Sequence, residues 1–239
     1  MFGIYKKEIK TFLNTLEGYV AILIFFTTTS LFLWFIPSEF NIIDSNKASL
    51  MSLFVISPFV LLLLIPAITM KMISVEMLEN TTTLLLAKPI KRWEIVISKF
   101  LASCTIGIIS IIPTFIFIYS IYQLSEPKGN IDIGEIFGSY IGLIMLIITY
   151  SSIGIFSSTL SKNSMISFIL TVSIIIFFLF GFEIIFQQYQ HDFLEYLSMM
   201  QHYESLSRGV VDSRDIIYFL SLNFCFLYAG ILQIEKKQI

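Results

Sequence analysis

The stretch Glu79–Ser103, ENTTTLLLAKPIKRWEIVISKFLAS, begins as a polar, proline-containing segment and ends in an apolar run. Another apolar run, Leu50–Ile73, precedes it, and the run that it enters extends over Val96–Tyr122. Each run is long enough to cross the hydrocarbon layer as a helix, which takes about 20 mainly apolar residues. The chain is therefore expected to leave a membrane after the first run and to re-enter it with the second.

The composition agrees with a membrane protein. Of the 239 residues, 56% are hydrophobic and 13% are charged, and the mean hydropathy is +0.84. A soluble domain carries about 25% charged residues, so this chain has too few to cover a surface that faces water. The net charge of −2 and the lack of a basic cluster do not indicate a nucleic-acid partner. Cys104 and Cys225 lie in apolar runs, which favours buried thiols over a disulfide.

Six apolar windows qualify as membrane-spanning helices, and their residues are continuous rather than alternating, which excludes a barrel of strands. The expected fold class is an all-α, polytopic membrane protein. The expected spans are Glu17–Ile36, Leu50–Ile73, Val96–Tyr122, Ile136–Leu160, Met165–Phe186 and Ile216–Ile234.

The positions of lysine and arginine predict the orientation, because cytoplasmic segments carry an excess of both. With a cytoplasmic N-terminus and six spans, eleven of the fifteen lie in cytoplasmic segments. These eleven are Lys6, Lys7, Lys10, Lys71, Lys88, Lys91, Arg92, Lys99, Lys162, Lys236 and Lys237. Both termini are therefore expected in the cytoplasm.

Residues 1–16 predict an interfacial helix along the inner leaflet of the lipid bilayer. Tyr5, Ile9 and Phe12 share one helical face, and Lys6 and Lys10 lie on the other. Two roles remain open for this helix: simple anchoring, or a ledge that also touches a cytoplasmic partner.

Prolines and glycines mark special positions within the spans. Pro58 and Pro66 are expected to break the second span and Pro113 the third, because each removes a backbone hydrogen bond. Gly138 and Gly142 form a G-x-x-x-G pair, which allows close helix packing. This packing is expected within the chain, and a dimer contact is the alternative.

The outer loop 187–215 is longer than a turn requires and is expected to form short helices near or dipping into the outer leaflet. Asp212 is placed to cap the N-terminus of the last span. Asp215 lies three residues later, near the positive end of the helix dipole. Four further residues match no compact metal-binding motif, and we expect them to be solvated loop residues: His191, Glu195, His202 and Glu204.

Catalytic signatures are absent from the sequence. It has no G-x-x-x-x-G-K-[ST] loop to hold ATP phosphates and no G-x-S-x-G. A self-powered ion-coupled transporter would place charges at mid-membrane depth, and Glu183 lies instead near the outer end of the fifth span. We expect a non-catalytic protein without metal or cofactor, and any energy for transport must come from a partner.

The polar segment between the second and third spans now has a predicted place on the cytoplasmic side. Val75–Lys88 is expected to form a short helix that ends at Pro89. Lys91, Arg92 and Lys99 follow, and we expect their side chains to extend back to the membrane surface. The helix is either an interfacial turn without a special role or a projection that fills a groove on a soluble partner.

The run Pro66–Ala102, PAITMKMISVEMLENTTTLLLAKPIKRWEIVISKFLA, resembles the first cytoplasmic loop of type-2 ABC exporter permeases. Nearly the whole chain is similar to the permease subunits associated with gliding motility, in particular FGIYKKEIKTFLNTLEGY at the start, SKNS at 161–164 and SRGVVDSRDIIYFLSLNFCFL at 207–227. The relatives often carry glycine at the place of Asn80, a carboxylate at Thr83 and arginine at Lys71.

The resemblance implies one transmembrane domain over residues 1–239, in the bacterial inner membrane. It implies two ABC ATP-binding subunits, a second permease copy and an auxiliary gliding-associated membrane protein as partners, with 75–95 as the coupling loop. The residues expected to contact the ATP-binding subunit are Glu76, Glu79, Thr81, Leu84, Leu85 and Pro89, with Lys162 and Asn163 as a second contact. The alternative is a mechanical or scaffold subunit that uses the same ATPase without moving a substrate.

Overall fold

The computed structural model describes residues 1–45, 48–79, 91–189 and 196–236, and every regular element in these ranges is a helix. In chain order the helices are α1 (Phe2–Asn14), α2 (Leu16–Trp34), α3 (Ile42–Ser45), α4 (Met51–Thr69), α5 (Ser74–Leu78), α7 (Arg92–Ile111), η1 (Ile112–Thr114), α8 (Phe115–Leu124), α9 (Ile133–Leu160), α10 (Ser164–Ile176), η2 (Phe177–Gly181), α11 (Phe182–Tyr189), α13 (Met199–Ser207) and α14 (Ser213–Lys236).

Five helical stretches in the described chain are long and apolar enough to cross a membrane, and the α1–α2 pair brings the number to six if it is counted as one span. The five are Met51–Leu78, Arg92–Leu124, Ile133–Leu160, Ser164–Phe186 and Ser213–Lys236. The expected all-α, polytopic fold is confirmed. The first of the six expected spans, Glu17–Ile36, corresponds to α2.

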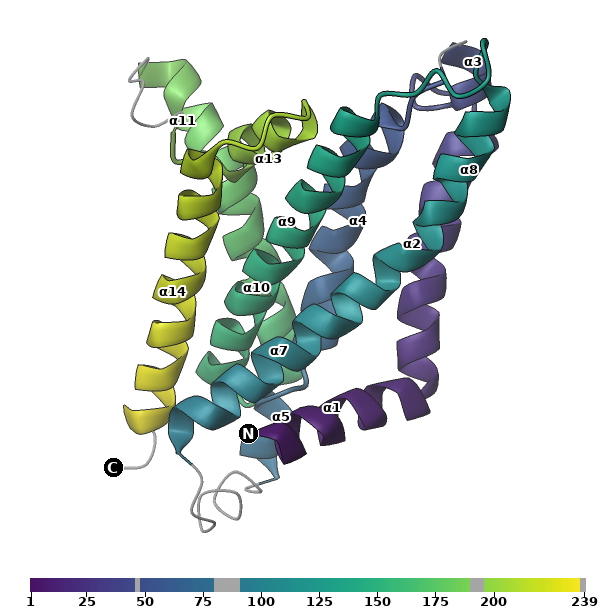
Figure 1. Ribbon diagram of the computed structural model, residues 1–239. Helices are drawn as coiled ribbons and strands as arrows, with labels where there is room; N and C mark the ends of the chain where they lie inside the picture. The colour runs from purple at the N-terminus through teal and green to yellow at the C-terminus, as the bar shows by residue number, and fades with distance from the viewer. Residues whose placement is uncertain (46–47, 80–90, 190–195, 237–239) are drawn as a thin grey trace.

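The two ends of the bundle carry different elements (Figure 1). We call the end with α1, α5 and the last turn of α14 the terminal end, and the end with α3, α11 and α13 the opposite end. The helix α1 lies across the terminal end, and a bend of 67° separates it from α2. This is the arrangement expected of an N-terminal helix that does not continue into the first span.

The helix α9 is the centre of the bundle, where it contacts α4, α7, α10, α13 and α14. Small residues make this possible, because they let neighbouring helices approach closely. A Cβ atom added to Gly154 would lie only 2.1 Å from Thr69 Oγ1 on α4. Some buried hydroxyls of α9 are satisfied within the helix, as in Ser157, which donates to the Ile153 carbonyl at 2.9 Å.

The prediction that Pro58 and Pro66 break the second span is wrong, because α4 is continuous from Met51 to Thr69. Pro58 has no N–H, which leaves the carbonyl of Phe54 without its helical donor. The hydroxyl of Tyr203 on α13 donates to this carbonyl at 2.6 Å. Burial raises the pKa of the Tyr203 phenol well above its usual value, so the hydroxyl keeps the proton that it donates. The break at Pro113 is confirmed, since the 3₁₀ turn η1 separates α7 from α8.

The pair Gly138 and Gly142 packs within the chain, as expected. A Cβ atom on Gly138 would lie 2.5 Å from the carbonyl oxygen of Leu206, and one on Gly142 would lie 3.1 Å from the ring of Tyr203. Both glycines therefore serve the contact between α9 and α13. Gly209 follows α13 with a φ of +84°, a conformation that favours glycine and turns the chain toward α14.

The segment 187–215, predicted as an outer loop, contains α13, which packs against α9 and α14. Asp212 caps α14 as expected, since its carboxylate accepts the N–H of Arg214 at 2.9 Å. The expectation of a solvated His202 is wrong: Nδ1 lies 2.6 Å from Asp215 Oδ1, and the side chain is mostly buried. Glu204 is exposed, as expected. His191 and Glu195 lie outside the described residues.

Candidate functional site

The predicted docking residues that the structure describes lie at the terminal end. Glu76 belongs to α5, Glu79 follows it, and Lys162 and Asn163 form the turn between α9 and α10. Contacts of α5 with both α9 and α10 bring these two segments together. Of the predicted coupling helix Val75–Lys88, the structure describes the part up to Glu79. The other four predicted residues lie outside the described ranges: Thr81, Leu84, Leu85 and Pro89.

The start of α5 is held by a side chain from α9. The hydroxyl oxygen of Ser158 accepts the N–H groups of Ile73 and Ser74 at 3.1 and 3.0 Å. The first N–H groups of a helix have no partner within the helix, and a hydroxyl is one of the groups that satisfies them. The start of the predicted coupling segment is thereby fixed to the helix at the centre of the bundle.

The two last residues of α5 point in different directions. Met77 is buried in the core, whereas Leu78 is 63% exposed. Met77 therefore faces the bundle, and Leu78 faces away from it. Glu79 is also exposed, so the chain leaves the bundle with an apolar and an acidic side chain at its surface.

The expectation that Lys99 extends back to the membrane surface is wrong, because its side chain is fully buried. Its ammonium lies 2.9 Å from Glu8 Oε1 on α1, 2.9 Å from Glu76 Oε1 on α5 and 2.5 Å from the carbonyl oxygen of Met72. A lysine ammonium has three N–H donors, and three acceptors surround this one. Burial of a charge is costly unless it is paired and hydrogen-bonded, and both conditions are met here.

Lys7 completes a charge-balanced group that we call the Lys99 cluster: Lys7, Glu8, Glu76 and Lys99. The Lys7 ammonium lies 3.4 Å from Glu76 Oε1 and 3.9 Å from Glu8 Oε1, and its side chain is exposed. Two lysines thus face two glutamates. The side chain of Glu76, expected at the docking surface, is turned toward this cluster.

The helix α1 is packed onto α7 along two turns. The hydroxyl of Ser98 donates to the carbonyl oxygen of Met1 at 3.0 Å, and the hydroxyls of Tyr5 and Thr105 lie 3.0 Å apart. The helix α1 is therefore attached to α7 at the terminal end of the bundle. Glu8 is not among the site residues predicted from the sequence. The pattern that could have indicated it is that Glu8 is the single acid among the lysines of an amphipathic helix.

In the turn between α9 and α10, Lys162 is exposed at the surface and Asn163 stabilises the start of α10. Lys162 and Asn163 are both exposed. The side-chain oxygen of Asn163 accepts the N–H of Met165 at 2.9 Å, so it caps the start of α10. This cap fixes the backbone that presents Lys162.

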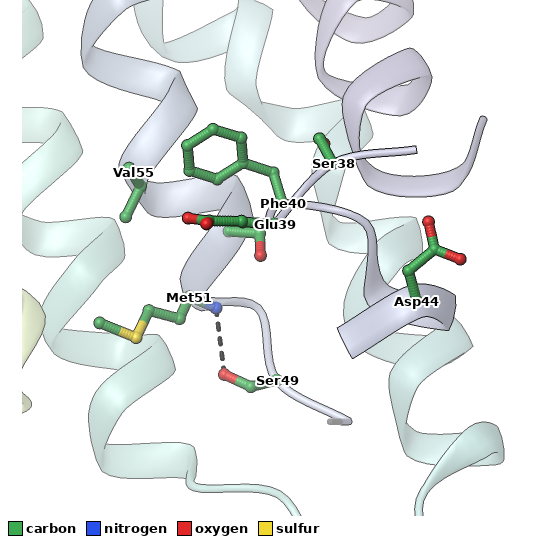
Figure 2. Close-up of a pocket in the computed structure, with 8 residues that line it drawn as sticks. Ser38, Glu39, Phe40, Asp44, Ser49, Met51 and Val55 are labelled. Carbon is green, nitrogen blue, oxygen red and sulfur yellow. Dashed lines mark hydrogen bonds between the residues drawn. The ribbon is translucent and has the colours of Figure 1, made fainter. Parts of the chain in front are cut away.

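At the opposite end, a cavity of about 630 Å³ lies beside the start of α4 (Figure 2). Glu39 and Asp44 are its acids, and the hydroxyl of Ser49 accepts the first N–H of α4, that of Met51, at 3.1 Å. A second cavity of about 460 Å³ lies between α4, α9 and α13. Within the described ranges no three histidine, cysteine or acidic residues gather as a metal site would require.

Comparison with known protein families agrees with this architecture. The family described as ABC-2 family transporter protein matches residues 3–228, which is most of the chain. No curated protein matches the sequence at a significant level. Members of this family are membrane permeases that associate with a separate ABC ATP-binding subunit. The chain belongs to the ABC-2 transporter family and is a multi-pass permease subunit of an ABC transporter.

Proposed function

We propose that the terminal end is the cytoplasmic docking surface for the ATP-binding subunit, in the bacterial inner membrane. The observation that carries the proposal is α5, a short helix that is anchored at its start and exposed at its end. Ser158 and Lys99 hold its first residues, and Leu78 and Glu79 are presented outward. A helix held in this way transmits a push to the bundle instead of bending under it.

The chemistry of the surface suits a groove on a soluble partner. Leu78 offers an apolar anchor, Glu79 an acid, and the neighbouring α9–α10 turn offers Lys162. Helix-in-groove recognition uses apolar anchors with charges at the rim. The remaining proposed contacts continue along the chain through Thr81, Leu84, Leu85 and Pro89. The excess of lysine and arginine on this side supports a cytoplasmic position.

The complex that we propose contains two permease copies and two ATP-binding subunits. Closure of the ATP-binding subunits would press on α5, and the bundle would shift between inward-open and outward-open states as a set of rigid helices. The similarity of several stretches to gliding-associated permeases supports a role in gliding motility with an auxiliary membrane protein.

That similarity also supports a second candidate, a mechanical subunit that acts on the cell envelope without moving a substrate. The purified complex in proteoliposomes distinguishes the two candidates. Permease-dependent ATPase activity with movement of a labelled lipid or saccharide supports transport. Robust activity without movement of any probe in a broad panel supports the mechanical subunit.

Co-purification in mild detergent tests the docking surface. The variants Leu78→Asp and Leu85→Asp place a charge in the proposed contact, and we expect recovery of the ATP-binding subunit to fall about tenfold or more, as for a contact of central importance. Ile43→Asp on α3 is the matched control, because Ile43 is also 63% exposed but lies at the opposite end. Unchanged recovery and unchanged ATPase stimulation in both terminal-end variants would overturn the proposal.

A further inference from the structure

Lys99 joins four segments of the chain at one atom. Its ammonium, carried by α7, contacts Glu8 of α1, Glu76 of α5 and the carbonyl of Met72 in the turn after α4. All three N–H donors of the ammonium are used. A shift of any one segment relative to α7 would leave a donor or a carboxylate oxygen without its partner.

The surroundings make such a shift unfavourable. Lys99 is fully buried, and the side chains of Glu8 and Glu76 are 13% exposed. A buried charge that loses its partner is strongly destabilising, because the free energy of removing it from water is no longer offset by an ion pair. The segments around Lys99 are therefore held to move together rather than to slide past one another.

The contact between α5 and α9 is of a different kind. It includes the neutral hydroxyl of Ser158, which accepts two backbone N–H groups, together with packing of the two helices. Neutral hydrogen bonds are weaker than charge-assisted ones by roughly a factor of two. α5 is thus joined to α1 and α7 by charged side chains, and to α9 and α10 by helix packing and neutral hydrogen bonds.

From these contacts we infer that Lys99 is a positioning residue for coupling, which makes α1, α5 and the terminal end of α7 one rigid unit. A push on α5 passes through this unit into α7, and α1 travels with it. The inference rests on the proposed docking at α5 and adds the route by which motion enters the bundle. The ammonium suits this arrangement because one nitrogen donates to all three acceptors, whereas the donors of the guanidinium of arginine are spread over three nitrogens in one plane.

Replacement of Lys99 tests the route in the whole complex. We expect Lys99→Met to assemble with the ATP-binding subunit but to lose about fivefold or more of the permease-dependent ATPase stimulation, within the usual range of coupling factors. Lys99→Arg should be impaired as well. Lys10→Met is the matched control, since Lys10 is an exposed lysine outside the cluster, and it should behave as the parent.

A variant that is neutral at Glu8, Glu76 and Lys99, and keeps only the exposed Lys7 charged, covers the case in which Lys99→Met fails to fold because the two carboxylates lose their central partner. Glu8→Gln, Glu76→Gln and Lys99→Met together remove the three central charges while keeping the shapes of the side chains. We expect this variant to accumulate and to bind the ATP-binding subunit with weakened stimulation. Parental stimulation in the neutral variant would overturn the inference.

A reversible cross-link tests the rigid unit directly. Cys104 and Cys225 are first replaced by alanine, and Tyr5→Cys and Thr105→Cys then place two thiols at the α1–α7 contact. A short bis-methanethiosulfonate reagent joins them, and reduction releases them. If α1 and α7 move as one, stimulation stays within about twofold of the reduced sample, below the usual range of coupling factors.

Loss of stimulation on cross-linking, with recovery on reduction, would show that α1 and α7 move relative to each other and would overturn the inference alone. If Leu78→Asp and Leu85→Asp instead recover and stimulate the ATP-binding subunit as the parent does, the docking proposal fails and the inference falls with it. The two failures are therefore distinguishable, because different variants report them.

Discussion

The two ends of the bundle are held together by different chemistry. At the terminal end, the Lys99 cluster connects α1, α5 and α7 through buried charges. At the opposite end, α13 is held by the hydrogen bond from Tyr203 to Phe54, by the close approach of Leu206 to Gly138 and by one hydrogen bond between His202 and Asp215. Charged contacts impose a large cost on separation, whereas close packing and neutral hydrogen bonds impose a smaller one. The end that we propose to receive force is the end where four charged side chains meet around a fully buried lysine.

The largest expected effect comes from Lys99→Met, which should lower the free energy of unfolding by about 3–5 kcal/mol because Glu8 and Glu76 lose their buried partner. Denaturation in mixed detergent micelles measures it, with Lys10→Met as the control. An unfolding free energy equal to that of the parent would show that the cluster does not hold the terminal end.

At the opposite end, Gly138→Ala should cost about 3 kcal/mol, the upper part of the range for overpacking, because the new methyl meets backbone atoms of α13 that cannot move aside. The same denaturation assay serves here. Gly230→Ala is the matched control: its Cβ would lie 3.7 Å from the nearest atom, an ordinary contact, and we expect no loss. Equal effects at the two glycines would contradict the packing of α13 on α9.

The variant Tyr203→Phe should cost about 2 kcal/mol, because it leaves the buried Phe54 carbonyl without a donor. Pro58→Ala restores the N–H that this carbonyl lacks. In a double-mutant cycle, Tyr203→Phe should therefore cost much less in the Pro58→Ala background than in the parent. Additive effects would show that Tyr203 does not compensate for Pro58.

The smallest effect is expected for Asn163→Ala, which should cost about 1 kcal/mol through loss of the α10 cap. Asn163→Ser keeps a capping oxygen and should restore most of this stability. Recovery of the ATP-binding subunit separates the two roles of this turn: if only Asn163→Ala weakens it, Asn163 acts through the backbone, and if both variants do, the amide contacts the partner.

The local pattern of the sequence predicts the helices and most of their limits, because apolar length and turn residues are local properties. It does not predict which side chains meet. Lys99 and Glu8 are 91 positions apart, and Tyr203 and Phe54 are 149 positions apart. From the sequence, Lys99 is two helical turns after Arg92 and is therefore predicted to reach the membrane surface. In the structure α1 packs over α7 and buries Lys99.

Pro58 is a second case in which a distant contact overrides a local prediction. Proline within a helical run predicts a break, since it removes a backbone donor. The hydroxyl of Tyr203 supplies a donor from a distant part of the chain, and α4 stays continuous. The site was predicted only in part for the same reason: its exposed positions follow from the loop, whereas the anchor of α5 depends on α1, α7 and α9.

Photo-cross-linking in native membranes tests the docking surface most directly. A photoreactive amino acid replaces Glu79 at the terminal end or, as a control, the exposed Glu39 at the opposite end. The account predicts an adduct between the permease and the ATP-binding subunit from position 79 and none from position 39. An adduct from position 39, or none from position 79 in a complex that co-purifies intact, would contradict it.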